Sequence, residues 1–248
     1  LEDIVLEQDL VFAEDIILDL NGKNITADTD AGFEVDDVIL KIRNGQLTDA
    51  TGGTGVIINT IANGAVVVEN STVMSGLVGG DAEVSWSDSN GDIHYATMKD
   101  ALTEGGSKAA EDNSTLSLIQ DMELTENATI PESITIHIPD GKELSVAENV
   151  TLTNEGSIVT DGAITNAGTI KNTEAANWKN EGVVANTTTG EIYNEGSLDN
   201  TSGQINNAGL FDGEGAIANE NGVITSTEGI IQNQIDNGAN GQIVSEAS

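Results

Sequence analysis

The chain has 248 residues, with 42 Asp and Glu against 8 Lys and Arg, so its formal net charge at pH 7 is −34. Such an excess of negative charge repels phosphate backbones and anionic lipid surfaces, which argues against nucleic-acid binding and against adsorption to acidic membranes. No apolar run approaches the roughly 18 residues of a membrane-spanning helix, so we expect no membrane insertion.

The composition describes an unusual core. Hydrophobic residues make up 38% of the chain and there are 28 glycines, close to the globular average, but only 7 residues are Phe, Trp or Tyr. The core must therefore consist of Ile, Val, Leu and Ala. The absence of cysteine excludes disulfides and thiolate metal sites. The chain begins at Leu1 without a Met or a basic leader, so we expect a mature product or an excised fragment.

Strands with Asn-Gly corners are expected in the N-terminal half. Alternating apolar residues mark residues 15–20, 37–43, 55–59 and 64–70, and Asn21-Gly22 and Asn44-Gly45 mark tight turns. A hairpin follows over residues 83–95, turning at 89–92, and a short helix is predicted over residues 96–102.

A short repeat dominates the C-terminal half. The phrase Asn-x-Gly-x-aliphatic or aromatic occurs at Asn154–Ile158, Asn166–Ile170, Asn180–Val184, Asn194–Leu198 and Asn207–Phe211. Each copy predicts a short strand with an inward apolar residue, followed by a bend where Asn and Gly adopt left-handed backbone angles. Such strands bury their apolar faces only by stacking coil upon coil, which predicts a parallel β-solenoid. Asparagines at the same phase of successive coils are expected to form side-chain amide ladders.

These motifs resemble a known group of proteins. Tyr95–Leu102, the later Asp140-Gly141-Lys142 turn and the Asn-x-Gly-x-Ile runs are similar to right-handed parallel β-helix regions of secreted bacterial, Gram-positive-like surface proteins. The phrase Asn166–Ile170 also resembles autotransporter passenger repeats. The resemblance implies an all-β, right-handed parallel β-helix of two tandem modules with a short capping helix between them.

The expected boundaries follow from this organisation. The first module covers residues 1–80 and is truncated at its start, the hairpin and capping helix cover 81–112, and the second module covers 113–248. The glycine spacing alone also fits a left-handed helix, and it does not give the number of strands per coil.

The function expected from the resemblance is non-enzymatic. It implies an extracellular, cell-surface stalk or a filament subunit that associates end to end. One alternative is an adhesin that binds a glycan or a host surface; a less favoured one is a carbohydrate-active β-helix. Asp36 and Asp37 are the best carboxylate pair for glycoside hydrolysis. A lyase would instead need an arginine as its base. Arg43, the sole arginine, is expected only to pair with a nearby acid.

Two kinds of ligand site are predicted. Trp178, in an insertion-like corner, is the best exposed aromatic platform for a sugar. Calcium is a possible cofactor because hard oxygen ligands gather in three acidic segments, although an Asn-Gly turn explains the third equally well. The predicted calcium ligands are Asp28, Asp30, Asp36, Asp37, Asp88, Asn90 and Asp92. His94 and His137 are expected to be ordinary strand residues.

Overall fold

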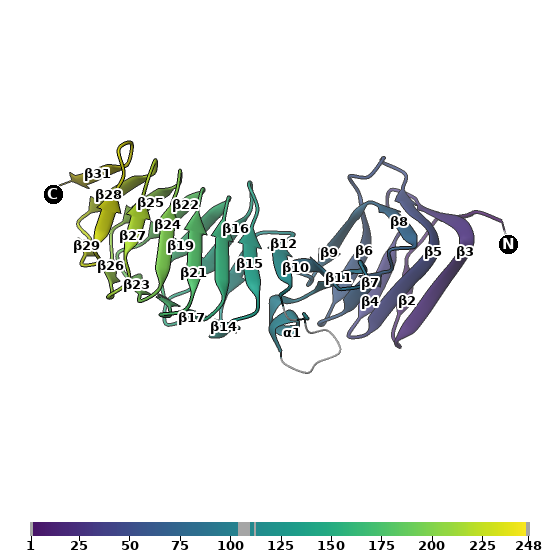
Figure 1. Ribbon diagram of the computed structural model, residues 1–248. Helices are drawn as coiled ribbons and strands as arrows, with labels where there is room; N and C mark the ends of the chain where they lie inside the picture. Colours follow the sequence, from purple (N-terminus) through teal and green to yellow (C-terminus); the bar gives the residue numbers. More distant parts are fainter. Residues whose placement is uncertain (1, 104–109, 112, 247–248) are drawn as a thin grey trace. The chain divides into compact units, whose positions relative to one another are not determined.

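The computed structural model describes residues 2–103, 110–111 and 113–246. The chain divides into two compact units, Leu1–Ser114 and Thr115–Ser248, and each is described here by itself. Both consist of stacked coils of parallel strands, so the predicted all-β solenoid is confirmed (Figure 1). In the described residues the α-helical structure is limited to α1 (Met98–Leu102).

Unit 1 has two parallel sheets. The first contains β1 (Ile4–Leu6), β3 (Ile16–Ala27), β5 (Ile39–Asp49) and β7 (Ala65–Val68), with β8 (Thr72–Ser75) also paired to β5. The second contains β2 (Leu10–Phe12), β4 (Phe33–Asp36), β6 (Val56–Ile61) and β9 (Leu77–Gly80).

Two Asn-Gly pairs of unit 1, Asn21-Gly22 and Asn44-Gly45, lie inside the long strands β3 and β5. Asn21 and Gly22 have φ values of 48° and 76°, and the pairing of β3 with β5 shifts register beside them. The left-handed residues therefore bend a continuous strand, where the sequence predicted a corner between two strands.

The predicted hairpin and short helix are confirmed. β10 (Val84–Ser87) and β11 (Ile93–Ala96) pair antiparallel, and β11 also pairs antiparallel with β7. In α1 the N-cap side chain of Thr97 accepts a hydrogen bond from the backbone N–H of Asp100, which fixes the start of the helix.

Unit 2 has three strands per coil and hence three faces; its strands are coloured from teal through green to yellow in Figure 1. The first face contains β12 (Thr115–Leu118), β15 (Thr135–Ile138), β18 (Ser157–Thr160), β21 (Asn177–Asn180), β24 (Ser197–Asn200), β27 (Ile217–Asn219) and β30 (Ile235–Asn237). The second contains β13 (Met122–Leu124), β16 (Glu143–Val146), β19 (Ala163–Asn166), β22 (Val183–Asn186), β25 (Gln204–Asn207), β28 (Val223–Thr227) and β31 (Gln242–Glu246). The third contains β14 (Ala128–Ile130), β17 (Thr151–Asn154), β20 (Thr169–Asn172), β23 (Glu191–Asn194), β26 (Leu210–Asp212) and β29 (Ile230–Ile231).

Each coil of unit 2 stacks its inward residues on those of the next coil. Asn177 pairs with Ser157 on one side and with Ser197 on the other, so one coil takes 20 residues there. Strands of four residues place the second and fourth side chains inside, because side chains alternate across a strand. The second position carries the apolar core, for example Ile158, Trp178 and Leu198 in consecutive coils.

The fourth position carries buried asparagine ladders, as the sequence predicted. On the third face the Nδ2 of Asn154 donates to Oδ1 of Asn172 (2.7 Å), and Asn172 donates in the same way to Asn194 (2.7 Å). Equivalent ladders of 2.7–2.8 Å bonds join Asn166, Asn186 and Asn207 on the second face and Asn180, Asn200, Asn219 and Asn237 on the first. Each Nδ2 thus satisfies the Oδ1 in the following coil.

The predicted left-handed bends at the Asn-x-Gly phrases are wrong. The ladder asparagines and the glycines two residues after them are absent from the positive-φ residues of the described chain. A Cβ at Gly182 would collide with the carbonyl oxygen of Gly162 and lie 2.6 Å from that of Asp161. Glycine is required there because neighbouring corners approach closely.

Candidate functional site

Trp178 is buried, so its prediction as an exposed sugar platform is wrong. Its side chain is 1% exposed and occupies the inward second position of β21. The indole Nε1 donates a 3.2 Å hydrogen bond to Oγ1 of Thr160 in the preceding coil. Neither ring face is available to a ligand.

A spacing in the sequence could have identified Trp178 as a core residue. Each ladder asparagine follows an inward apolar residue by two positions, as Leu152 precedes Asn154 and Ile170 precedes Asn172. Trp178 stands at the same distance before Asn180. The corner of residues 173–176 is an insertion, but the following strand resumes the normal phase.

The predicted calcium residues do not assemble into a metal site. In the part of the chain that the structure describes, no three Asp, Glu or His side chains are placed to hold a metal ion. Asp28 and Asp30 are exposed in the 28–32 loop between β3 and β4, and Asp36 and Asp37 are exposed at the end of β4. The geometry therefore gives calcium no support at these positions.

Asp88, Asn90 and Asp92 come together in the turn of the hairpin. Asp88 Oδ1 accepts hydrogen bonds from the backbone N–H groups of Asn90 and Asp92, and its Oδ2 lies 3.0 Å from Nε2 of His94. Burial opposes the charge of Asp88, but these hydrogen bonds outweigh it and lower its pKa. The His94 ring also stacks on Trp86, with centroids 5.0 Å apart. These contacts show that Asp88, Asn90 and Asp92 come together because they form and stabilise the hairpin turn.

Asp36 and Asp37 lie next to each other at the end of β4, whereas glycoside hydrolysis needs two carboxylates that flank the scissile bond. They are consecutive residues, and Asp37 adopts a left-handed φ of 54° in the turn after β4. Arg43, as predicted, pairs with an acid: its Nε lies 2.9 Å from Oδ2 of Asp19.

A Ser-His-Asp chain that the sequence analysis missed lies on the first face of unit 2. Ser117 Oγ is 3.2 Å from His137 Nδ1, and His137 Nε2 is 2.9 Å from Asp161 Oδ2. These residues are 20 and 24 positions apart, close to one coil, so the coil length was the missing signal. Ser117 and His137 are register partners on the paired strands β12 and β15.

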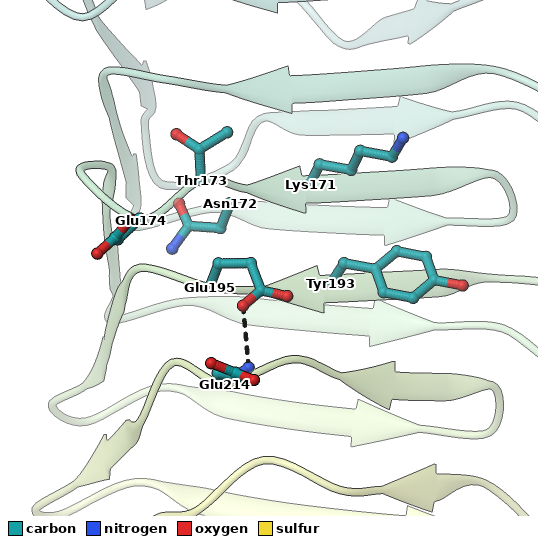
Figure 2. Close-up of a pocket in the computed structure, with 7 residues that line it drawn as sticks. All are labelled: Lys171, Asn172, Thr173, Glu174, Tyr193, Glu195 and Glu214. Atoms are coloured by element: carbon teal, nitrogen blue, oxygen red, sulfur yellow. Dashed lines mark hydrogen bonds between the residues drawn. The ribbon is translucent and has the colours of Figure 1, made fainter.

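A groove of about 600 Å³ opens on the third face and the corner that follows it. We call it the Tyr193 groove. It is lined by Lys171, Asn172, Thr173, Glu174, Tyr193, Glu195 and Glu214 (Figure 2). Lys171 and Tyr193 are register partners on β20 and β23, and Figure 2 shows their side chains extended in the same direction.

The groove lies at three successive corners, of which residues 173–176 and 213–216 form two long ones and Glu195-Gly196 forms the short one between them. Residues 173–176 make a wider turn than the corner at Glu195-Gly196, and the buried Ala176 fixes the end of that turn. Glu174, Glu195 and Glu214 are exposed along the corner, and Glu195 Oε2 accepts the backbone N–H of Glu214 at 3.1 Å. The corner side of the groove therefore carries carboxylates from three successive coils.

Tyr193 provides a held aromatic ring. It is half-buried, and its hydroxyl donates a 3.2 Å hydrogen bond to Oε2 of Glu191. Burial and this carboxylate both raise the pKa of Tyr193. Lys171 stands exposed beside the ring, so the groove combines one cation, carboxylates and an amphipathic aromatic side chain.

Comparison with protein-family models, curated proteins and solved structures finds no match for this chain. The likeness to bacterial surface β-helices thus rests on the sequence motifs alone. Among the described residues, no helix has the length and apolar character needed to cross a membrane.

Proposed function

We propose that the chain is a non-enzymatic structural module of an extracellular surface protein, in which the solenoid acts as a stiff spacer. Right-handed winding and a capping role for α1 belong to the same proposal. The resemblance of its repeats to surface β-helices supports the location.

The buried ladders are the observation that carries the spacer role. A core of stacked aliphatic residues tolerates small slips between neighbouring coils, because dispersion is not directional. Amide hydrogen bonds are directional, and a slipped ladder would leave buried amides unpaired at a cost of about 1–3 kcal/mol each. Ladders on all three faces of unit 2 therefore resist shear and bending between coils.

A spin-label distance tests this stiffness. The chain has no cysteine, so Glu123→Cys and Thr225→Cys create the only labelling sites. These positions lie five coils apart along the second face, through Ser145, Thr165, Ala185 and Asn206. Strands of neighbouring coils are about 4.8 Å apart, so we expect a narrow distance distribution near roughly 24 Å that salt does not change.

Deletion of one coil is the matched control. Removing residues 177–196 joins Ala176 to Ser197 in the register that Asn177 occupied. The distance should shorten by about 5 Å while the distribution stays narrow. A broad distribution, or an unchanged mean after the deletion, would contradict a stiff spacer.

A second candidate role is end-to-end association with another copy. Apolar side chains are exposed on strands at both edges, including Val5 (62%) and Val11 (56%) near the N-terminus and Ile243 (52%) on β31. β1, β2 and β31 are each the end strand of their sheet, so a second copy could pair with the backbone groups left open at these edges. The large net charge opposes this association at low salt.

Sedimentation over a concentration series at high salt tests that role. End-to-end growth should appear in the unaltered chain and disappear in Val5→Lys/Val11→Lys. Ile61→Lys, on the internal strand β6, is the control and should not change the association. A monomer at every concentration would rule it out.

A further inference from the structure

We infer that the Tyr193 groove binds a neutral, polyhydroxylated ligand, namely a short stretch of uncharged polysaccharide. This inference is independent of the spacer role, because it concerns one outer corner of unit 2.

The size and position of the groove suit such a ligand. Its volume of about 600 Å³ lies within the range of small-molecule sites. It extends along the stacking direction of the coils, since its lining residues come from three successive coils and Lys171 and Tyr193 are register partners in two of them. An extended chain of sugar rings could therefore continue along the corner past Glu195 and Glu214.

The side chains in the groove match both surfaces of a sugar ring. The C–H face of a pyranose is apolar and packs on an aromatic ring, and the half-buried Tyr193 is amphipathic in the same way. Hydroxyl groups both donate and accept hydrogen bonds. Glu174 and Glu195 supply acceptors only, whereas the Lys171 ammonium supplies donors only and the Thr173 hydroxyl supplies both.

The charges favour a neutral ligand over an ionic one. Three carboxylates in the groove and the net charge of −34 repel polyanions. A polycation would be attracted to those carboxylates but would meet the Lys171 ammonium on the strand beside Tyr193. An uncharged ligand with hydroxyl groups can accept hydrogen bonds from the Lys171 ammonium and donate hydrogen bonds to the carboxylates of the groove at the same time.

The two tyrosines of the chain give a direct readout. Uniform labelling with 3-fluorotyrosine produces signals for Tyr95 and Tyr193 only, and Tyr193→Phe assigns them. The probes are the hexasaccharides of β-1,4-glucose, β-1,4-mannose and β-1,4-N-acetylglucosamine, with trigalacturonate and spermine as charged comparisons. We expect one or more of the neutral hexasaccharides to shift the Tyr193 fluorine resonance while that of Tyr95 stays in place.

Matched lysine variants locate the contact. Lys171→Ala should weaken binding of the active hexasaccharide by about tenfold. Lys179→Ala removes a lysine from the same third strand position on the first face and should leave affinity unchanged. The inference is overturned if no neutral hexasaccharide shifts Tyr193 up to about 10 mM, a concentration that would detect even weak binding. It is equally overturned if the two lysine variants weaken binding alike, or if only spermine or trigalacturonate produces the shift.

Discussion

The Nδ2 of Asn166 donates a 2.8 Å hydrogen bond to the Oδ1 of Asn186 in the next coil, and both side chains are buried. Asn186 in turn donates to Oδ1 of Asn207 at 2.8 Å and to the backbone oxygens of Gly190 and Leu210. One side chain thus connects three coils.

Asn186→Ala should therefore lower the free energy of unfolding of unit 2 by about 2–4 kcal/mol, because it leaves buried amide and carbonyl groups unpaired. Urea unfolding followed by Trp178 fluorescence in a Trp86→Phe background measures this quantity. Asn177→Ala truncates an exposed asparagine on β21, the strand before the one that carries Asn186. This variant should change the free energy of unfolding by less than about 0.5 kcal/mol. Equal effects of the two variants would show that the ladder contributes no special stability.

Because neighbouring corners approach closely, replacing a glycine with alanine should destabilise the fold to a different extent at two positions. Gly182→Ala should destabilise unit 2 by about 3 kcal/mol or more, because its Cβ would collide with the carbonyl oxygen of Gly162. Gly141 has a left-handed φ of 76° but nothing within 4 Å of its Cβ position. Gly141→Ala should cost only about 1 kcal/mol. The same urea titration compares them, and a larger effect at Gly141 would contradict the packing argument.

The loop after β5 is closed by one carboxylate. Asp49 accepts hydrogen bonds from the backbone N–H groups of Gly53 (2.9 Å) and Gly55 (2.8 Å) and from the Thr51 hydroxyl (2.7 Å). The Gly53 hydrogen bond is the main cause that lowers the pKa of Asp49 from 3.8 to about 2. A folded-state pKa below the unfolded value means that the charged form stabilises the fold.

This stabilisation should be complete above pH 4 to 5 and be lost as the pH falls from 3.8 towards about 2. We expect the amide proton resonances of Gly53 and Gly55 to titrate with a midpoint near 2 and the 50–55 loop to lose exchange protection below it. Asp49→Asn is the control and should abolish that titration. A midpoint near 4 would show that the carboxylate is not held by these N–H groups.

The second-face ladder can be lengthened by one residue. Ser226 is the register partner of Asn207 in the next coil, at the position where the next asparagine would stand. Ser226→Asn should offer an Oδ1 to the Nδ2 of Asn207 and raise the free energy of unfolding by about 1 kcal/mol. Thr225→Asn places the same side chain outside and should have no such effect. No gain at position 226 would mean that the corner geometry there has already departed from the ladder.

The repeat made much of this fold predictable. A strict Asn-x-Gly phase with an apolar residue two positions before each asparagine specifies a stacked strand, and the ladders follow from the shared phase. The number of strands per coil could not be derived from the sequence. Glycine spacings of 6 to 8 residues give the length of each strand and corner, but they do not say after how many strands the chain returns to the same face. The prediction that Trp178 is exposed is wrong because the four-residue corner ends at Ala176, and Trp178 already lies inside the next strand. The Tyr193 groove was missed since its residues come from three coils, and contacts between coils depend on the coil length.

The ladders also give unit 2 a polarity. In every ladder the amide NH₂ points to the C-terminal coil and the oxygen to the N-terminal one, and the first oxygens, those of Asn154, Asn166 and Asn180, are buried without a donor among the described residues. Aligned side-chain amides add their dipoles head to tail, as peptide groups do along a helix. The three ladders thus act as parallel rows of dipoles whose negative ends lie at the N-terminal coils. Each row can be extended only by a coil whose asparagine oxygens point to the N-terminal side, so a coil stacked in the opposite orientation would not fit.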